Sequence, residues 1–305
     1  MSETEKREFS GVDGLPDGRA SKIVTPGCIC LEGGAFRGVY TSGVLDALME
    51  ADINMQCTIG VSAGALNGMN YVSGQIGRSG RINLKYRHEP TYVGTQVSRE
   101  NKGVIGFDFL LKRVNRYIPF DYKAFNRPER RFVAVACGCA DGKPAYFEKG
   151  VCKEIYQAVR ASSSLPFLSE PVNIDGKYYL DGGCAVKIPF KWAIEQGYEN
   201  IIVVKTHSAD YQPKPNEINR LAPTVYRNHQ KFAHTLYYSD RAYLRELYQL
   251  DLLEKRKRVF IIQPSVEIKV SRLESDMEKL GRLYYLGYED TKRLIPELME
   301  YLNRK

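Results

Sequence analysis

The stretch Gly60-Val61-Ser62-Ala63-Gly64 decides the fold, and it follows the pattern G-x-S-x-G. It joins a short apolar run at residues 57–61, which predicts a strand, to a helical pattern at residues 63–76. A serine at a sharp strand-to-helix turn has an exposed hydroxyl and free neighbouring amides, as nucleophilic catalysis requires. The glycines let the backbone turn where a larger residue would clash. The stretch therefore predicts a βα unit with Ser62 as a candidate nucleophile.

A glycine-rich turn lies upstream and reads Gly33-Gly34-Ala35-Phe36-Arg37-Gly38. It follows a strand candidate at residues 27–31 and precedes an amphipathic helical pattern. Such a turn directs several backbone amides to one point, where they bind negative charge. The charge is either a phosphate or the oxyanion of an acyl-transfer intermediate. The phosphate interpretation is weaker, because the P-loop and G-x-G-x-x-G spacings are absent. A turn whose glycines serve only close packing is the third interpretation.

The third informative stretch, Tyr179-Leu180-Asp181-Gly182-Gly183, follows a hairpin signal at residues 173–177 whose Asp-Gly pair is typical of a tight turn. Asp181 is therefore either a turn aspartate or a carboxylate at a strand end that faces Ser62. Gly33, Ser62 and Asp181 each come soon after a predicted strand. Ligands of parallel α/β sheets bind at the carboxyl ends of the strands, so we expect these residues to share one site.

Taken in order, the three stretches resemble the patatin-like phospholipase family. A fourth, Ala161-Ser162-Ser163-Ser164-Leu165-Pro166-Phe167, resembles the segment before that family's aspartate, so the resemblance covers residues 26–205. More narrowly, the chain is similar to the bacterial branch with a C-terminal extension. The resemblance implies a three-layer α/β/α fold with a mainly parallel sheet. It also implies a serine–aspartate dyad without histidine that hydrolyses acyl esters of phospholipids, lysophospholipids or related lipids.

On this interpretation Ser62 attacks the ester carbonyl and Asp181 accepts its proton. The other site residues are the oxyanion donors Gly33, Gly34 and Ala35, the loop supports Arg37 and Gly38, and the elbow glycines Gly60 and Gly64. Ala35 stands where the family usually has a third glycine, so the oxyanion site requires that this position needs no positive φ. An aspartate at its ordinary pKa of about 4 is a poor base, so the mechanism also requires that burial raises the pKa of Asp181.

Two alternatives stay open. Ser62, Asp181 and His207 occur in the chain order of an α/β-hydrolase triad, but only one βα unit precedes Ser62, whereas that fold places several strands before its nucleophile. The second alternative is a catalytically silent lipid-binding or regulatory protein on the same fold, with Ala35 as its sign. Protease and thioesterase activities would use the same nucleophile chemistry.

Composition restricts the cofactors, partners and cellular location that we expect. The chain has 305 residues, a net charge of +8 and seven cysteines without C-x-x-C or zinc spacing, so we expect no metal, no cofactor and no disulfide. The positive charge favours an anionic partner, and peripheral contact with an anionic membrane agrees with a lipid substrate. No nucleic-acid-binding signature occurs. Because the N-terminus lacks an apolar signal core, we expect a cytoplasmic protein. The oligomeric state and the preferred head group are left open.

We expect a flexible polar tail at residues 1–24, a catalytic domain at residues 25–205, and a mostly helical region at residues 206–305. The last of these packs on the same domain if the strand candidate at residues 259–262 rejoins the sheet. An insertion at residues 78–128 carries Phe107, Leu110 and Val114 at helical spacing. That helix either packs on the core, as is commoner, or docks on a membrane.

Overall fold

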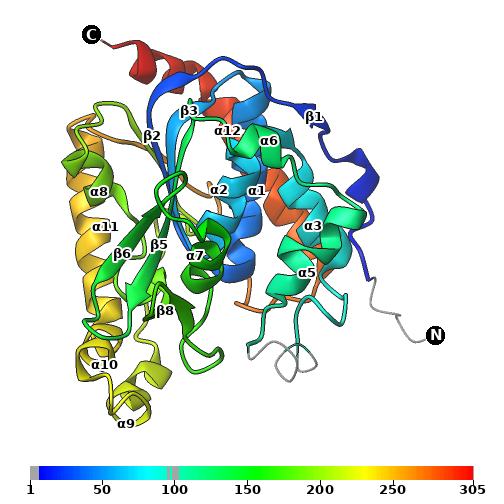
Figure 1. Cartoon of the computed structure of the whole chain (residues 1–305). Helices are drawn as coiled ribbons and strands as arrows, with labels where there is room; N and C mark the ends of the chain where they lie inside the picture. The colour runs from blue at the N-terminus through cyan, green and yellow to red at the C-terminus, as the bar shows by residue number, and fades with distance from the viewer. Residues whose placement is uncertain (1–6, 95–96, 98–102, 305) are drawn as a thin grey trace.

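The computed structural model describes residues 7–94, 97 and 103–304, and a mixed sheet forms its centre (Figure 1). The strand order is β10-β9-β2-β3-β5-β8-β7, with β6 paired to β5. The parallel strands are β2 (Thr25–Leu31), β3 (Met55–Val61), β5 (Arg131–Gly138), β9 (Ile201–Val204) and β10 (Phe260–Ile262). The antiparallel strands are β6 (Pro144–Glu148), β7 (Val172–Ile174) and β8 (Lys177–Asp181).

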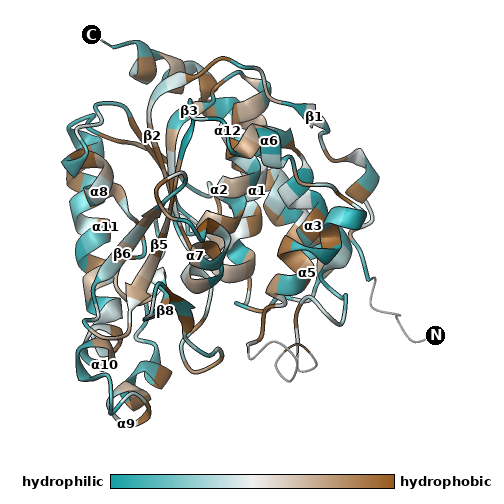
Figure 2. Cartoon of the chain, viewed as in Figure 1, coloured by the Kyte–Doolittle hydropathy of each residue, from teal (hydrophilic) through white to brown (hydrophobic). Residues whose placement is uncertain are grey.

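Helices cover both faces of this sheet, because its strands alternate apolar side chains between two cores. In β2, Ile29 and Leu31 belong to one core, whereas Cys28 and Cys30 belong to the other. The first face carries α1 (Val39–Glu50), α2 (Ala63–Val72), α7 (Ile155–Ser162) and α12 (Met277–Asn303). The second face carries α8 (Phe190–Glu195) and α11 (Ser239–Lys255), and Figure 2 shows how hydrophobic the strands between the two layers are. The predicted three-layer α/β/α fold with a mainly parallel sheet is confirmed.

The shorter elements surround this framework. They are η1 (Val12–Gly14), β1 (Gly18–Arg19), η2 (Ala35–Gly38), β4 (Gln75–Ile76), α3 (Arg78–Tyr86), α5 (Phe107–Leu111), η3 (Arg113–Arg116), α6 (Tyr122–Phe125), η4 (Gly182–Cys184), η5 (Glu217–Leu221), α9 (Ala222–Val225) and α10 (Gln230–Tyr237).

The N-terminal segment is more ordered than its polar composition indicates. Val12 and Leu15 are buried, and β1 pairs with β4. The expected flexible tail at residues 1–24 is therefore wrong for residues 12–19, because two apolar side chains anchor an otherwise charged segment; residues 1–6 lie outside the described residues.

The insertion at residues 78–128 packs on the core. Phe107 and Val114 are buried, and Leu110 is only 9% exposed. These side chains therefore cannot dock on a membrane, and core packing is the correct alternative. Residues 95–96 and 98–102, within its glycine-rich first half, lie outside the described residues.

The C-terminal region completes the sheet and one helical layer. β10 pairs in parallel with β9, as expected for a strand that rejoins the sheet. α12 packs against α1 and begins at Met277, where the Asp276 carboxylate accepts a hydrogen bond from the Lys279 amide at 2.9 Å. None of the helices in the described part of the chain has the length and apolar character needed to cross a membrane.

Candidate active site

Ser62 occupies the turn between β3 and α2, as the sequence predicts. Its backbone has φ 55° and ψ −122°, a strained conformation for a residue with a side chain. The two elbow glycines are required by close packing. A Cβ on Gly60 would lie 2.5 Å from the backbone of Gly64, and one on Gly64 would lie 2.5 Å from the Leu31 carbonyl oxygen. These contacts fix the turn tightly enough to hold Ser62 in its strained conformation.

The glycine-rich loop between β2 and η2 lies directly against Ser62. A Cβ on Gly33 would be 3.2 Å from the Ser62 Cβ, so a side chain here would displace the nucleophile. The Gly33 amide donates a long hydrogen bond of 3.4 Å to the Lys187 carbonyl. Among the described residues, the amides of Gly34 and Ala35 have no hydrogen-bond partner. The loop thus offers two unpaired amides, and the third predicted donor is partly engaged.

Ala35 adopts a backbone conformation that glycine prefers, with φ 50°. The condition that this position needs no positive φ is therefore not met. A left-handed alanine costs about 1–2 kcal/mol relative to glycine, because its Cβ approaches the following carbonyl. The loop keeps its conformation in spite of this strain, and the Ala35 amide stays unpaired.

Replacing Ala35 by glycine should raise the free energy of unfolding by about 0.5–1 kcal/mol, since relief of strain exceeds the added entropy of the unfolded chain. Ala242→Gly is the matched control, because Ala242 lies within the α11 helix and the same change there should lower the free energy of unfolding by about 1 kcal/mol. Chemical denaturation measures both. A destabilised Ala35→Gly protein would contradict the interpretation.

Asp181 is the last residue of β8, which is antiparallel to β5. Asp181 therefore lies at the end of an antiparallel strand, as the last residue of the predicted hairpin. It still reaches the site because β8 pairs only with the last three residues of β5, where Ala136 lies opposite Asp181. On the other side of β5, Val61 pairs with Val135, so Ser62 and Asp181 flank the end of the same strand.

The Asp181 carboxyl is 4% exposed, and burial raises its pKa to about 6. The Gly183 amide donates to its Oδ1 at 2.7 Å, whereas the buried Oδ2 has no hydrogen-bond partner among the described residues. Ser62 lies close enough to stabilise the ionised carboxylate and so to lower its pKa, although no hydrogen bond joins the two side chains. Catalytic hydrogen bonds are commonly long until substrate binds. The burial that the mechanism requires is present.

One segment, at residues 161–167, holds both Ser62 and Asp181 in place. The Ser62 amide donates to the Ser162 hydroxyl at 2.9 Å, and the Asp181 amide donates to the Ser164 carbonyl at 2.8 Å. In the sequence, only the family resemblance singles out this segment. Its serines position the site by accepting hydrogen bonds from the backbone amides of Ser62 and Asp181, which a local sequence pattern does not reveal.

The predicted loop supports differ in their contacts. The Gly38 carbonyl accepts a hydrogen bond from the Asn67 side chain at 2.7 Å, which ties the loop to α2. The Arg37 side chain makes no hydrogen bond within the described residues, and its Nε is buried without a partner, so this side chain does not hold the loop as expected. Thr206 holds the loop instead. Its hydroxyl lies 3.2 Å from the Gly33 carbonyl, and its amide donates to Glu32 at 2.6 Å.

His207 lines a cleft together with Ser62 and Asp181, but its ring bonds to another residue. Its Nδ1 is 2.9 Å from Glu267 Oε1, and its ring stacks on Tyr211. Burial lowers the pKa of His207. Because the imidazole bonds to Glu267 and not to Asp181, the alternative triad is not formed.

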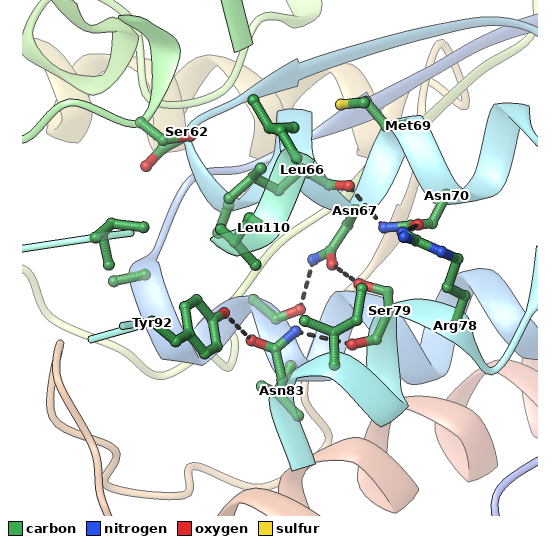
Figure 3. Close-up of a pocket in the computed structure, with 18 of the residues that line it drawn as sticks. Ser62, Leu66, Asn67, Met69, Asn70, Arg78, Ser79, Asn83, Tyr92 and Leu110 are labelled. Carbon is green, nitrogen blue, oxygen red and sulfur yellow. Dashed lines mark hydrogen bonds between the residues drawn. The ribbon is translucent and has the colours of Figure 1, made fainter. Parts of the chain in front are cut away.

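Two hollows meet at Ser62. The first is a mainly apolar hollow between α2, α3 and α5. Figure 3 shows Leu66, Met69 and Leu110 around it, with Ser62 at one end and Arg78 at the other. The second is a polar cleft that contains Gly34, Asp181 and Lys187. Ser62, Ala35 and Leu165 line both hollows.

The far end of the apolar hollow is closed by a polar group. Arg78 is buried and donates to Asn70 at 2.6 Å, to Asn115 at 2.8 Å and to the Ile118 carbonyl at 3.0 Å. Burial lowers its pKa to about 10, so it stays charged at neutral pH. The His, Cys, Asp and Glu side chains of the described ranges form no cluster that could hold a metal ion.

A family model for patatin-like phospholipases matches residues 29–194, more than half of the chain, and a domain of unknown function (DUF6363) matches residues 229–303. The uncharacterised protein YjjU of Escherichia coli strain K12 is 28% identical over an alignment of 273 residues, and the match covers 86% of this chain and 75% of YjjU.

Two solved structures align at low identity. VipD from Legionella pneumophila is 14% identical with a TM-score of 0.47, over 97% of this chain and 72% of VipD. The effector ExoU of Pseudomonas aeruginosa is 13% identical with a TM-score of 0.42, over 92% of this chain and 54% of ExoU. The family model spans the glycine-rich loop, Ser62 and Asp181, which converge at one edge of the sheet, and the chain belongs to the patatin-like phospholipase family.

Proposed function

We propose that this protein is a serine acyl hydrolase that cleaves acyl esters of phospholipids, lysophospholipids or related lipids. Membership of the patatin-like phospholipase family supports lipid hydrolysis as the class of reaction. The observation that carries the finer assignment is the buried, unpartnered Asp181 Oδ2 beside Ser62, at the meeting point of an apolar hollow and a polar cleft.

The proposed reaction has two halves. Ser62 Oγ attacks the ester carbonyl carbon while Asp181 Oδ2 accepts the hydroxyl proton. The tetrahedral intermediate then collapses, and the leaving alcohol takes that proton. In the second half, water attacks the acyl-enzyme, Asp181 again serves as base, and the fatty acid leaves as Ser62 is restored.

Backbone groups stabilise the charge that develops. The unpaired amides of Gly34 and Ala35 are suited to the oxyanion, and each well-aimed donor contributes about 3 kcal/mol. The N-terminus of α2 adds partial positive charge beside Ser62. The acyl chain occupies the apolar hollow between α2 and α5, where Leu66 and Met69 exclude water.

A panel of acyl esters tests this function. The wild-type protein should release fatty acid from p-nitrophenyl esters and from lysophospholipids, and Ser62→Ala should lower the rate to background. Both proteins are first compared by circular dichroism. If no ester in the panel is hydrolysed by the folded wild-type protein, a silent lipid-binding protein is the better description.

The pH dependence should report the pKa of Asp181. As a general base it works only when ionised, so kcat/KM should rise with pH through about 6 and then level off. A carboxylate at its ordinary pKa would place this limb near pH 4. The pH–rate profile on a neutral ester distinguishes the two, and a limb near pH 4 would show that burial does not tune Asp181.

A further inference from the structure

The apolar hollow ends at a buried positive charge that has only neutral partners. Arg78 is 5% exposed, and its guanidinium lies at the end of the hollow opposite Ser62 (Figure 3). None of the described residues that line this hollow is an aspartate or a glutamate. The described acceptors of the Arg78 hydrogen bonds are the side-chain amides of Asn70 and Asn115 and backbone carbonyls. These acceptors satisfy hydrogen bonds but leave the buried charge uncompensated.

The place of Arg78 in its helix adds to this positive charge. Arg78 is the first residue of α3, at the positive end of the helix dipole, and the first turn holds no acidic residue. One carboxylate, Asp46, reaches the start of α3. It accepts hydrogen bonds from the Gly77 amide at 2.8 Å and the Tyr284 hydroxyl at 2.6 Å, and it forms no ion pair with Arg78 within the described residues. An anion beside Arg78 would therefore be stabilised by the guanidinium and by the dipole.

The same end of the hollow has hydrogen-bond donors that are not in use. The Arg78 Nη1 group donates to Asn70 at 2.6 Å, and the second of its two hydrogens has no acceptor among the described residues. The Tyr156 hydroxyl also lines the hollow and is buried, again without a described partner. Tyr122 connects the two groups. Its ring is 5.9 Å from the Tyr156 ring, and its hydroxyl accepts a hydrogen bond from Asn115, which itself accepts one from Arg78.

We propose that this end of the hollow binds a carboxylate at the distal end of the acyl chain, with Arg78 as its cationic ligand and Tyr156 as a second donor. The inference rests on the proposed function and narrows its acyl groups to those of dicarboxylic acids, esterified at one end and ionised at the other. The methylene chain would lie along Leu66 and Met69, between Ser62 and Arg78. A guanidinium and a carboxylate form paired, charge-assisted hydrogen bonds, so the ligand would compensate the buried charge.

The test compares p-nitrophenyl esters that differ only at the far end of the acyl chain, which carries a methyl group, a carboxylate or the methyl ester of that carboxylate. A series of chain lengths is screened, because the distance from Ser62 to Arg78 sets the best length. At that length the wild-type protein should show a kcat/KM at least about tenfold higher for the carboxylate than for the methyl group, mainly through a lower KM. The methylated carboxylate, which keeps the oxygens without the charge, should show no such preference.

Arg78→Met should abolish this preference, which is a ratio and so does not depend on the fraction of active protein. Arg81→Met is the matched control and should keep it. Arg81 lies in the same helix and also donates to backbone carbonyls, those of Leu15 and Pro16, but it does not line the hollow. Because Arg78 also ties α3 to its neighbours, a second variant is needed. Tyr156→Phe removes only a hydroxyl without a described partner, and it should reduce the preference about threefold.

A binding measurement separates this inference from the proposed function. In Ser62→Ala, a free dicarboxylic acid from the series should raise Tm more than the monocarboxylic acid of equal length, and adding Arg78→Met should remove the difference. Failure to hydrolyse any ester would refute the proposed function, and the Tm comparison would then decide the inference by itself. A wild-type protein that uses the methyl-ended or the methylated ester as well as the carboxylate at every length would overturn the inference. So would a preference that survives Arg78→Met.

Discussion

Asp181→Asn is expected to lower kcat for ester hydrolysis about 10³-fold while the protein stays folded. The amide keeps the shape of the carboxyl, and its oxygen can accept the Gly183 amide hydrogen bond. It cannot take the Ser62 proton at the position of Oδ2, so the nucleophile loses its base. Steady-state kinetics on a p-nitrophenyl ester at pH 8, where Asp181 is ionised in the wild-type protein, measures the loss.

The same substitution should not reduce stability, which separates a catalytic role from a structural one. The pKa of Asp181 in the folded protein, about 6, lies above its ordinary value. Ionisation of Asp181 at neutral pH therefore opposes folding. The contribution of this carboxyl to the free energy of unfolding is lost as pH rises through about 6. A neutral amide removes that cost, so Tm at pH 8 should equal or exceed the wild-type value. Asp175→Asn, at the exposed hairpin turn, is the matched control and should change neither property. Retention of more than a tenth of the activity by Asp181→Asn would count against the dyad.

Gly43→Ala should lower the free energy of unfolding by about 3–5 kcal/mol, the largest stability effect that we expect. Gly43 lies in α1 where α12 crosses it, and a Cβ there would be 2.0 Å from the Tyr284 carbonyl oxygen. On the opposite helix, a Cβ on Gly287 would be 2.1 Å from the Tyr40 carbonyl oxygen. The two helices therefore pack backbone to backbone, and a single methyl group must separate them.

The sign of this effect tests the packing directly. Within a free helix, glycine to alanine stabilises by about 1 kcal/mol, so a rise in Tm would show that α12 does not pack on α1 at Gly43. Gly14→Ala is the control, because a Cβ there would meet only the Tyr285 hydroxyl, at an ordinary 3.8 Å. Differential scanning calorimetry should show a Tm lower by about 10 °C for Gly43→Ala and little change for Gly14→Ala.

The elements that the sequence predicts are those whose signal is local. The apolar runs of β2, β3 and β9 and the Asp-Gly turn before β8 are visible in a few consecutive residues. The antiparallel direction of β8 relative to β5 is not visible in this way, because it depends on which end of β5 the hairpin meets. β6 was not predicted either, since each of its five residues is exposed or only partly buried and no buried apolar stripe marks it.

The residues of the site also differ in whether a local sequence pattern reveals them. Ser62 and Asp181 stand in glycine-rich patterns that single them out. Ser162, Thr206 and Lys187 do not, because their contacts with the site arise from packing between segments that are far apart in the chain. The positive φ of Ala35 and the raised pKa of Asp181 are likewise consequences of the fold, which places one residue in a tight turn and removes the other from water.

The most direct measurement of the central claim is covalent labelling of the folded protein with a fluorophosphonate, followed by peptide mass spectrometry. An activated serine with an oxyanion site should react at Ser62, and the adduct should be absent from Ser62→Ala and form far more slowly in Asp181→Asn. A folded wild-type protein that carries no adduct at Ser62, or that labels equally fast without the Asp181 carboxylate, would contradict the account.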